Sequence, residues 1–324
     1  MKKKILTLVA VCAAMTANAT VLRVSNVNGS TAPYSTIQSA VDAATAGDTI
    51  MVDGSTESYG ETEIDKQLVL IGPGYWINDN ELVQEAVPSA KVQFIVNKGA
   101  AGTIIKGFST SDRLNAAFEI HADKCVVTRC YIKSSSYLGI LFTREDSNDP
   151  MPSGAVVHQN FFDGCNVGGS STNVQITNNI FCKRGQGEWD ISGMESSYIA
   201  YNTMINGENI EISYAPFNMV NTSTIEYNIL WSKEIRYDNI GIKDKNHWGD
   251  NLVTNVYPSS FNTDKDVQAA ELAVSEGKYG AFAGDSPYVL SGIPAAPVIE
   301  DLIVPTTVEA GSKMKVTLKV GIQK

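Results

Sequence analysis

The segment Val157–Phe162 reads Val-His-Gln-Asn-Phe-Phe, and the segment Ile176–Phe181 reads Ile-Thr-Asn-Asn-Ile-Phe. Each places an apolar residue three positions before an Asn and further apolar residues directly after it. Three more segments follow this pattern, the first with Cys in place of Asn: Val127–Ile132, Ile199–Met204 and Ile225–Leu230. The Asn or Cys positions lie 30, 19, 23 and 26 residues apart. Uneven spacing of this size suits a solenoid whose turns vary in length, so the repeat predicts an all-β fold, a right-handed parallel β-helix.

The repeated Asn has a structural explanation. Neighbouring coils of such a solenoid lie about 4.8 Å apart, so inward Asn side chains at equivalent turns can hydrogen-bond to one another. The sequence predicts a ladder of Asn160, Asn179, Asn202 and Asn228 with no catalytic role. Cys130 takes the ladder position one coil earlier.

Two of the four cysteines that remain after the first segment are expected to be core thiols. Cys130 and Cys165 fall at inward positions, where a free Cys behaves as a small buried hydrophobe. Cys125 and Cys130 are roughly 17 Å apart on extended chain, too far for a disulfide.

A second strand follows each repeat, with apolar residues on both sides of one middle residue. Period two turns the apolar residues inward and the middle residue outward. The predicted outward column is Glu119, Gly139, Asn166, Asp190, Glu211 and Gly241, and the next one is His121, Leu141, Gly168, Ser192, Ser213 and Lys243.

The N-terminal part predicts a capping helix. Ser35–Gln38 has the pattern of a capping box, apolar residues follow at helical spacing, and Gly47 ends the pattern. The segments Thr36–Val41, Ala46–Ile50 and Gly72–Gly74 resemble the opening of the pectin-lyase-like β-helix superfamily, and the resemblance covers residues 35–260. The segments Gly280–Gly284 and Ser286–Pro294 resemble the closing part of secreted β-helix proteins from Bacteroidetes.

Three parts of the chain can be delimited. Residues 1–19 have a Lys cluster, an apolar run and Ala17-Asn18-Ala19, which predicts a signal peptide and an exported protein, periplasmic, cell-surface or extracellular. Residues 20–290 form the predicted β-helix with its N-terminal cap. Residues 291–324 contain a Pro-rich connection and one alternating strand from Met314 to Val320, expected to pack along the helix; a sorting or partner-docking role is the alternative.

Charge and hydropathy exclude some partners. No later segment is apolar enough to span a membrane. Loss of three leader lysines changes the formal charge from -10 to -13, which argues against nucleic acid as a partner. The same charge repels acidic polysaccharides unless cations or a local basic patch offset it.

The resemblance implies a polysaccharide groove over the outer face of the second predicted strand of each coil. Asn166, Asp190 and Glu211 would project there from adjacent coils, as ligands of Ca²⁺ or as a glycosidase carboxylate pair. Solvated acids on a surface are the alternative. Lys183 and Arg184 are candidate catalytic bases near Asp190, with Lys243 on a later coil as a further cationic contact.

Other candidates are contacts for substrate. His121 lies two residues from Glu119, and Tyr201 and Tyr227 share one outward column as a platform for sugar rings, or as rim packing under a turn. The Asn-Thr-Asp, Asp-Asp, Gly-His-Gly and Arg-x-Lys motifs of polygalacturonase-like enzymes are missing, as are the local signatures of calcium-dependent pectate lyases. The sequence therefore predicts a carbohydrate-directed protein, either a divergent polysaccharide lyase or glycoside hydrolase, or a non-catalytic glycan-binding or adhesin-like scaffold.

Overall fold

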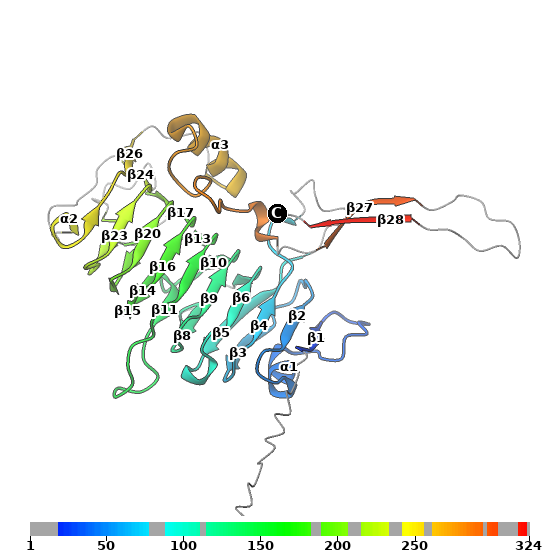
Figure 1. The fold of residues 1–324 in the computed structure, drawn as a ribbon. Helices are drawn as coiled ribbons and strands as arrows, with labels where there is room; N and C mark the ends of the chain where they lie inside the picture. The colour runs from blue at the N-terminus through cyan, green and yellow to red at the C-terminus, as the bar shows by residue number, and fades with distance from the viewer. Residues whose placement is uncertain are drawn as a thin grey trace, which may run out of the picture.

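The computed structural model describes residues 19–77, 88–110, 115–182, 189–206, 215–232, 242–255 and 261–293, and the backbone of 297–303 and 317–322. The described chain is mostly β, with two long parallel sheets and few helices, as Figure 1 shows. This architecture is compatible with the parallel solenoid that the repeat predicts.

In each sheet, neighbouring strands come from successive passages of the chain. Sheet A has ten strands: β1 (Val21–Val24), β2 (Thr49–Val52), β4 (Val69–Ile71), β6 (Ile104–Lys106), β9 (Val126–Thr128), β12 (Val156–His158), β16 (Gln175–Thr177), β20 (Tyr198–Ala200), β23 (Thr224–Glu226) and β25 (His247–Trp248). Sheet B begins with β22 (Phe217–Asn218), β18 (Ile191–Ser192), β14 (Asn166–Gly169), β11 (Leu138–Phe142), β8 (Phe118–Ile120) and β5 (Lys91–Val96). It continues with β7 (Ser109–Thr110), β10 (Tyr131–Lys133), β13 (Phe161–Asp163), β17 (Ile180–Cys182), β21 (Thr203–Ile205), β24 (Ile229–Trp231) and β26 (Leu252–Thr254); β3 (Gly60–Ile64) pairs with β5.

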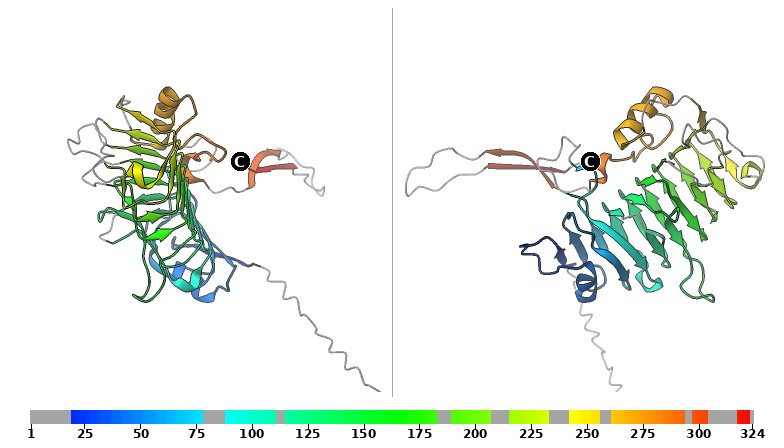
Figure 2. Two further views of the ribbon diagram at one scale, coloured as in Figure 1. Left: turned by 60° about the vertical axis from the view of Figure 1, so that its left-hand side comes forward. Right: turned by 180° about the vertical axis from the view of Figure 1, so that it is seen from behind.

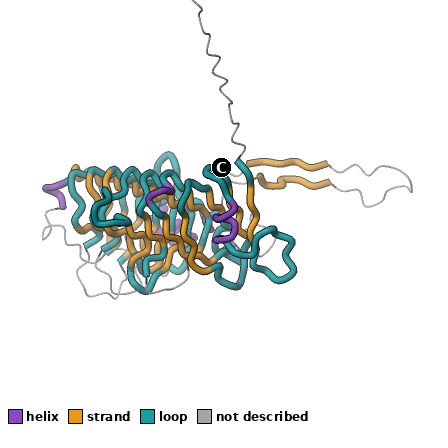
Figure 3. Tube along the Cα trace, turned by 90° about the horizontal axis from the view of Figure 1, so that it is seen from below, coloured by secondary structure: helices purple, strands orange, loops and turns teal. Residues whose placement is uncertain are grey.

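We call one passage of the chain through both sheets a coil. Equivalent strands of successive coils pair in parallel, as when Val157 of β12 faces Val127 on one side and Ile176 on the other. In the three-residue strands of sheet A such as β9, β12 and β16 the middle residue is buried. The strands stack side by side along the molecule (Figures 2 and 3). Phe162 and Phe181, in neighbouring coils, stack with their ring centroids 4.5 Å apart. The apolar alternation in the sequence therefore produces one continuous core.

The asparagine ladder is confirmed. Asn160 Nδ2 donates to Asn179 Oδ1 at 3.0 Å, and the same bond joins Asn179 to Asn202 and Asn202 to Asn228 at 3.0 Å each. The Cys130 backbone N–H donates to Asn160 Oδ1, so Cys130 does take the ladder position. The ladder also extends to Asn251, whose Oδ1 accepts from Asn228 Nδ2 at 2.9 Å. Sequence reasoning missed Asn251 because Trp248 replaces the aliphatic residue of the motif.

The residue before each ladder position has a left-handed backbone. Its φ lies between 54° and 57° at Arg129, Gln159, Asn178, Tyr201 and Tyr227. Residues other than Gly and Asn adopt this backbone conformation at a cost in conformational energy. The ladder hydrogen bonds and the strand pairing must therefore hold the turn in place. These five side chains form one outward column, which we call the turn column.

The predicted alignment of the second strands was wrong at two coils, by two residues at one and by five at the other. Ile140, not Leu138, pairs with Phe118, which places Leu141 beside Glu119. A bulge between Leu138 and Ile140 restores the register with β14. Ile191 pairs with Phe217, so the strand on that coil is Phe217–Asn218 and not residues 210–212. The segment between the ladder position and the second strand differs in length from coil to coil. The position of the second strand therefore cannot be predicted by counting a fixed number of residues from the ladder.

Helix α1 (Ile37–Ala43) packs against β1, β2 and β3 at the N-terminal end. Its N-cap is Thr36, whose side chain accepts from the Ser39 backbone N–H, so the predicted capping position was wrong by one residue. The helix also ends earlier than predicted, because Ala44 already has an extended backbone. Ile37, Ala40 and Val41 are buried, as expected of a cap over the first coil.

Residues 261–293, which we call the closing segment, run back along the coils (Figure 1). Helix α3 (Asp264–Ser275) begins with a capping box of Thr263 and Asp266. Its Val267 and Ala270 form a second apolar cluster with outward residues of sheet B, including Ile180, Ile205 and Trp231. The segment ends in the 3₁₀ turn η4 (Leu290–Gly292) beside Tyr75. The outer face of the strands from β13 to β24 is therefore covered.

The C-terminal residues differ from the expectation. Strands β27 (Pro297–Ile303) and β28 (Thr317–Ile322) pair antiparallel as a separate sheet, where the sequence predicted one strand. Figures 1 and 2 draw this hairpin apart from the coils, so it is the closing segment that packs along them. The remaining elements are short: η2 (Lys98–Ala100), α2 (Ile242–Lys245), and the pair β15 (Ser171–Thr172) and β19 (Met194–Glu195).

The four described cysteines are buried and form no disulfide with one another, which confirms the prediction for Cys130 and Cys165. Burial raises the pKa of the Cys125 thiol to about 11 and that of Cys130 to about 12. Since the thiolate is the reactive form, we expect a chain that starts at Thr20 to react with a thiol reagent only after unfolding. A colorimetric thiol assay in native and denaturing buffer measures this, and rapid labelling of the native chain would contradict the core assignment.

Candidate functional site

The candidate groove lies over the strands that were called second strands in the sequence analysis. They are β8, β11, β14, β18 and β22, each the third strand of its coil, and we call them the third-strand row. Asn166 and Asp190 lie next to each other in it, because Val167 pairs with Ile191. The prediction that Asp190 faces water is wrong: the residue is 0% exposed. Its backbone N–H donates to Pro216 O on the next coil, so the residue beside Asp190 is Pro216 rather than Glu211.

Three predicted catalytic residues cannot be placed. Glu211, Lys183 and Arg184 lie outside the described residues. The described part of the proposed Ca²⁺ site is Asn166 and Asp190, which offer one amide and one carboxylate where Ca²⁺ takes six to eight oxygens. Within the described ranges no group of three or more His, Cys, Asp or Glu side chains could hold a metal ion. Asn166 and Asp190 therefore do not fit a calcium site by themselves.

Glu119 and His121 are brought together, as the sequence suggested. They extend from β8, and His121 Nε2 lies 3.5 Å from Glu119 Oε1. His121 Nδ1 lies 3.0 Å from the Thr143 carbonyl oxygen of the next coil. Both ring nitrogens therefore lie near oxygen atoms, which fixes the orientation of the ring. The Glu119 side chain is 35% exposed and that of His121 is 9% exposed, so the carboxylate is the accessible member of the pair.

Tyr201 and Tyr227 stack on each other, with ring centroids 5.0 Å apart and planes 10° from parallel. The free faces of the stack are occupied. A Cβ placed at Gly284 of the closing segment would lie 3.2 Å from the Tyr201 ring, and the Tyr279 ring lies 6.4 Å from Tyr227. A sugar platform requires an open ring face. The geometry therefore corresponds to the alternative of rim packing, with the ring edges half-exposed.

The sequence predicted Lys243 in an outward column of the third-strand row, and this prediction was wrong. It belongs to helix α2, with its Nζ 5.4 Å from the centroid of the Trp248 ring. This cation–π contact with a ring at the end of sheet A gives the exposed lysine a local structural role.

The closing segment is held on the turn column by side-chain contacts that the sequence did not reveal. Asn178 Nδ2 donates to the carbonyl oxygens of Ala281 and Ala283 at 3.0 and 2.8 Å. Gln159 Nε2 donates to the Pro287 carbonyl oxygen, and Arg129 Nη1 donates to that of Ile293 at 2.8 Å. This side of sheet B is therefore closed to a ligand, whereas β8 remains open at Glu119.

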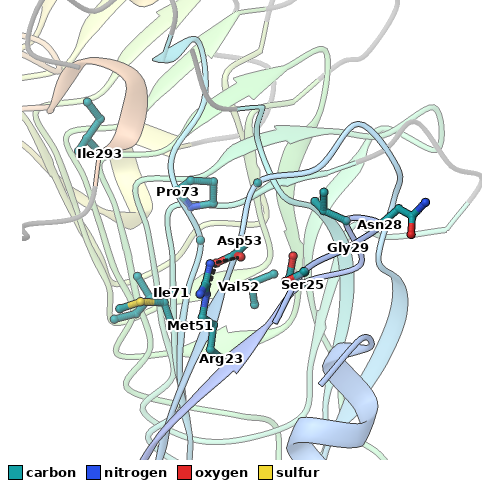
Figure 4. A pocket seen from close by; sticks show the side chains of 14 residues that line it. Arg23, Ser25, Asn28, Gly29, Met51, Val52, Asp53, Ile71, Pro73 and Ile293 are labelled. Carbon is teal, nitrogen blue, oxygen red and sulfur yellow. Dashed lines mark hydrogen bonds and ion pairs between the residues drawn. The ribbon is translucent and has the colours of Figure 1, made fainter. Parts of the chain in front are cut away.

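A pocket of about 710 Å³ lies at the N-terminal end of sheet A, which sequence reasoning also missed. Figure 4 shows Met51, Ile71 and Pro73 along it, with Ile293 of the closing segment at one end. Beside Met51, Arg23 makes a paired contact with Asp53, at 3.0 and 2.7 Å. The lining comes from four separated segments of the chain, so no local motif identifies it.

Comparison with known proteins gives no family. No protein-family model, curated protein or solved structure matches the chain. Of the described helices, none has the length and apolar character needed to span a membrane.

Proposed function

We propose that the chain is an exported, carbohydrate-directed protein with the right-handed parallel β-helix fold of the pectin-lyase-like superfamily. Export rests on the leader-like residues 1–19, and the fold rests on the coil register and the asparagine ladder. The ligand is a polysaccharide that lies across the open part of the third-strand row.

The observation that carries this proposal is the Glu119–His121 pair on an exposed strand position. A carboxylate accepts hydrogen bonds from sugar hydroxyls, and the His121 ring fixes its orientation through a contact of 3.5 Å. Parallel strands repeat about every 4.8 Å, so successive coils offer a regular surface to a repeating polymer. Leu141 lies beside Glu119 on the next coil and provides an apolar contact for a sugar face.

Affinity electrophoresis of the mature chain against pectate, alginate, chondroitin and neutral glycans tests the proposal. We expect retardation by one class of glycan, and at least a tenfold loss of affinity in Glu119→Gln, since a hydrogen bond to a charged group contributes about 1.5–3 kcal/mol. Glu195→Gln is the matched control, because Glu195 is also exposed but lies on β19. Equal retardation of both variants, or none by any glycan, would reject the proposed site.

The same pair favours hydrolysis or β-elimination as a second function. A His and a carboxylate in contact can pass a proton to or from a bound sugar, and positioned proton transfer contributes about 10²–10⁴-fold to rate. Reducing-end release and absorbance of unsaturated products, with and without Ca²⁺, measure turnover directly. Glu119→Gln and His121→Asn should each abolish any turnover, while His247→Asn, an exposed histidine on β25, should not. Glycan binding without turnover by the wild-type chain would instead support a non-catalytic, glycan-binding scaffold.

A further inference from the structure

A row of polar side chains crosses the outer face of sheet A. Lys106, Thr128 and His158 are Cα partners on three successive coils, so their side chains project side by side about 4.8 Å apart. Arg129 follows Thr128 directly and begins the turn column. Two cations, Lys106 and Arg129, thus lie on neighbouring coils of a protein whose mature charge is strongly negative.

No carboxylate of the described ranges forms an ion pair with either cation. Arg129 donates from Nε to Gln159 Oε1 at 2.9 Å and from Nη1 to the Ile293 carbonyl oxygen at 2.8 Å. Both acceptors are uncharged, and the Nη2 group makes no hydrogen bond within the described part of the chain. Among the described residues the ion pairs use other cations, and no carboxylate pairs with Lys106 or Arg129.

The surroundings of Lys106 and Arg129 destabilise their charged forms. Burial lowers the pKa of Lys106, and the positive charge of Arg129 lowers it further. Burial also lowers the pKa of Arg129. Half-buried charges without a counterion are costly, and an anion placed between them would offset both the burial and the mutual repulsion.

His158 is occupied elsewhere. Its Nδ1 lies 3.1 Å from the Thr177 carbonyl oxygen, and its Nε2 lies 3.1 Å from Ser286 Oγ of the closing segment. Burial lowers the pKa of His158, so the neutral ring accepts from the Ser286 hydroxyl. His158 therefore closes one side of the site, and the charge that an anion meets comes from Lys106 and Arg129.

Lys106 and Arg129 do not themselves line the pocket of about 710 Å³, but each has a direct neighbour that does. Ile71, which lines it, is the Cα partner of Lys106, and the Ile293 carbonyl that binds Arg129 belongs to another lining residue. Met51, Ile71 and Pro73 give the pocket an apolar wall (Figure 4). Arg23, the Cα partner of Met51, is already paired with Asp53, so the unneutralised charge lies beyond Ile71.

We propose that this place binds an organic carboxylate with an apolar body. The carboxylate lies between Lys106 and Arg129, and the body lies in the pocket against Met51, Ile71 and Pro73. A guanidinium and an ammonium together match a carboxylate, with the free Nη2 of Arg129 and Lys106 Nζ as donors. This site lies on sheet A and is separate from the Glu119–His121 pair on sheet B, so either can fail without the other.

Isothermal titration of the mature chain with octanoate tests the proposal. We expect one saturable site, binding of octanoate at least about tenfold tighter than of acetate or octanamide, and a loss of at least about tenfold in Lys106→Gln. Met51→Ser should weaken octanoate without changing acetate. Lys91→Gln, an exposed lysine on β5, should bind as the wild type does.

The contradicting outcomes are equally distinct. Octanoate binding that Lys106→Gln leaves unchanged would reject the cation pair, and acetate or inorganic phosphate binding as tightly as octanoate would reject the role of the pocket. Absence of saturable octanoate binding would reject the whole site. Circular dichroism of each variant shows whether it has folded, and Arg129→Lys, which keeps the charge, provides a second test if Lys106→Gln does not fold.

Discussion

Asn202→Ala should lower the free energy of unfolding by about 4 kcal/mol. Asn202 lies in the middle of the ladder and is 0% exposed. Its Oδ1 accepts from both the backbone N–H and the Nδ2 of Asn179 at 3.0 Å. Without this oxygen two buried donors lose their acceptor, and each such loss costs about 1–3 kcal/mol. Urea unfolding followed by tryptophan fluorescence measures the change.

The control for this experiment is Asn218→Ala. Asn218 is half-buried at the end of sheet B, and its Nδ2 makes only a 3.4 Å contact with Ser192 Oγ. We expect a change below about 1 kcal/mol for it, as for other weakly bonded positions near a surface. If Asn202→Ala were no more destabilising than Asn218→Ala, the ladder would not be what holds the coils in register.

Glu271→Gln should remove a pH dependence of stability that amounts to about 3 kcal/mol in the wild-type chain. Glu271 of helix α3 is 2% exposed and accepts from the backbone N–H groups of Ala281 and Phe282 at 3.1 and 3.0 Å. The Thr203 hydroxyl of β21 also donates to it. This carboxyl thereby links α3, the rest of the closing segment and the coils.

The direction of the effect follows from the pKa of Glu271. Burial raises this pKa from 4.5 to about 7, while the three hydrogen-bond donors act in the opposite sense. Between pH 4.5 and about 7 the folded carboxyl holds a proton that the unfolded chain has lost. The stabilisation is complete below about pH 4.5 and is lost as pH rises towards 7, at about 1.36 kcal/mol per unit.

Urea unfolding at pH 5, 6, 7 and 8 gives the dependence for both proteins. Asp264 and His158 also have shifted pKa values, but they remain in the variant, so the difference between the two curves isolates Glu271. A variant that keeps the wild-type slope would show that Glu271 does not titrate in this range.

The sequence predicted those parts of the fold that depend on neighbours in the repeat. The ladder, the inward aliphatic positions and the buried cysteines follow from the motif itself, because stacked coils impose the same environment on equivalent residues. The second strands were harder to align. Turns of unequal length and the bulge at Leu138 change the offset from the ladder. Asp190 is buried although Ile191 beside it pairs with Val167 as predicted, so its burial could not be read from the strand register.

The candidate sites were predictable only where their members are close in sequence. Glu119 and His121 belong to one strand, and alternation alone places them together. The stack of Tyr201 on Tyr227 also follows from the ladder register, but its cover by Gly284 and Tyr279 depends on a segment far along the chain. The second candidate site was not predictable, because its members are far apart in sequence. Lys106, Arg129 and the pocket residues lie on different coils, Ile293 belongs to the closing segment, and no local motif marks any of them.

The central claim is that a polysaccharide binds across the third-strand row at Glu119. Hydrogen–deuterium exchange of a chain that starts at Thr20, with and without an oligosaccharide of the glycan that retards it, measures where binding occurs. We predict protection of amides in β8 and β11, around Glu119, His121 and Leu141, and none in the covered strands β17 and β21. Protection confined to other coils, or no change in β8 and β11 at saturating oligosaccharide, would contradict the assignment.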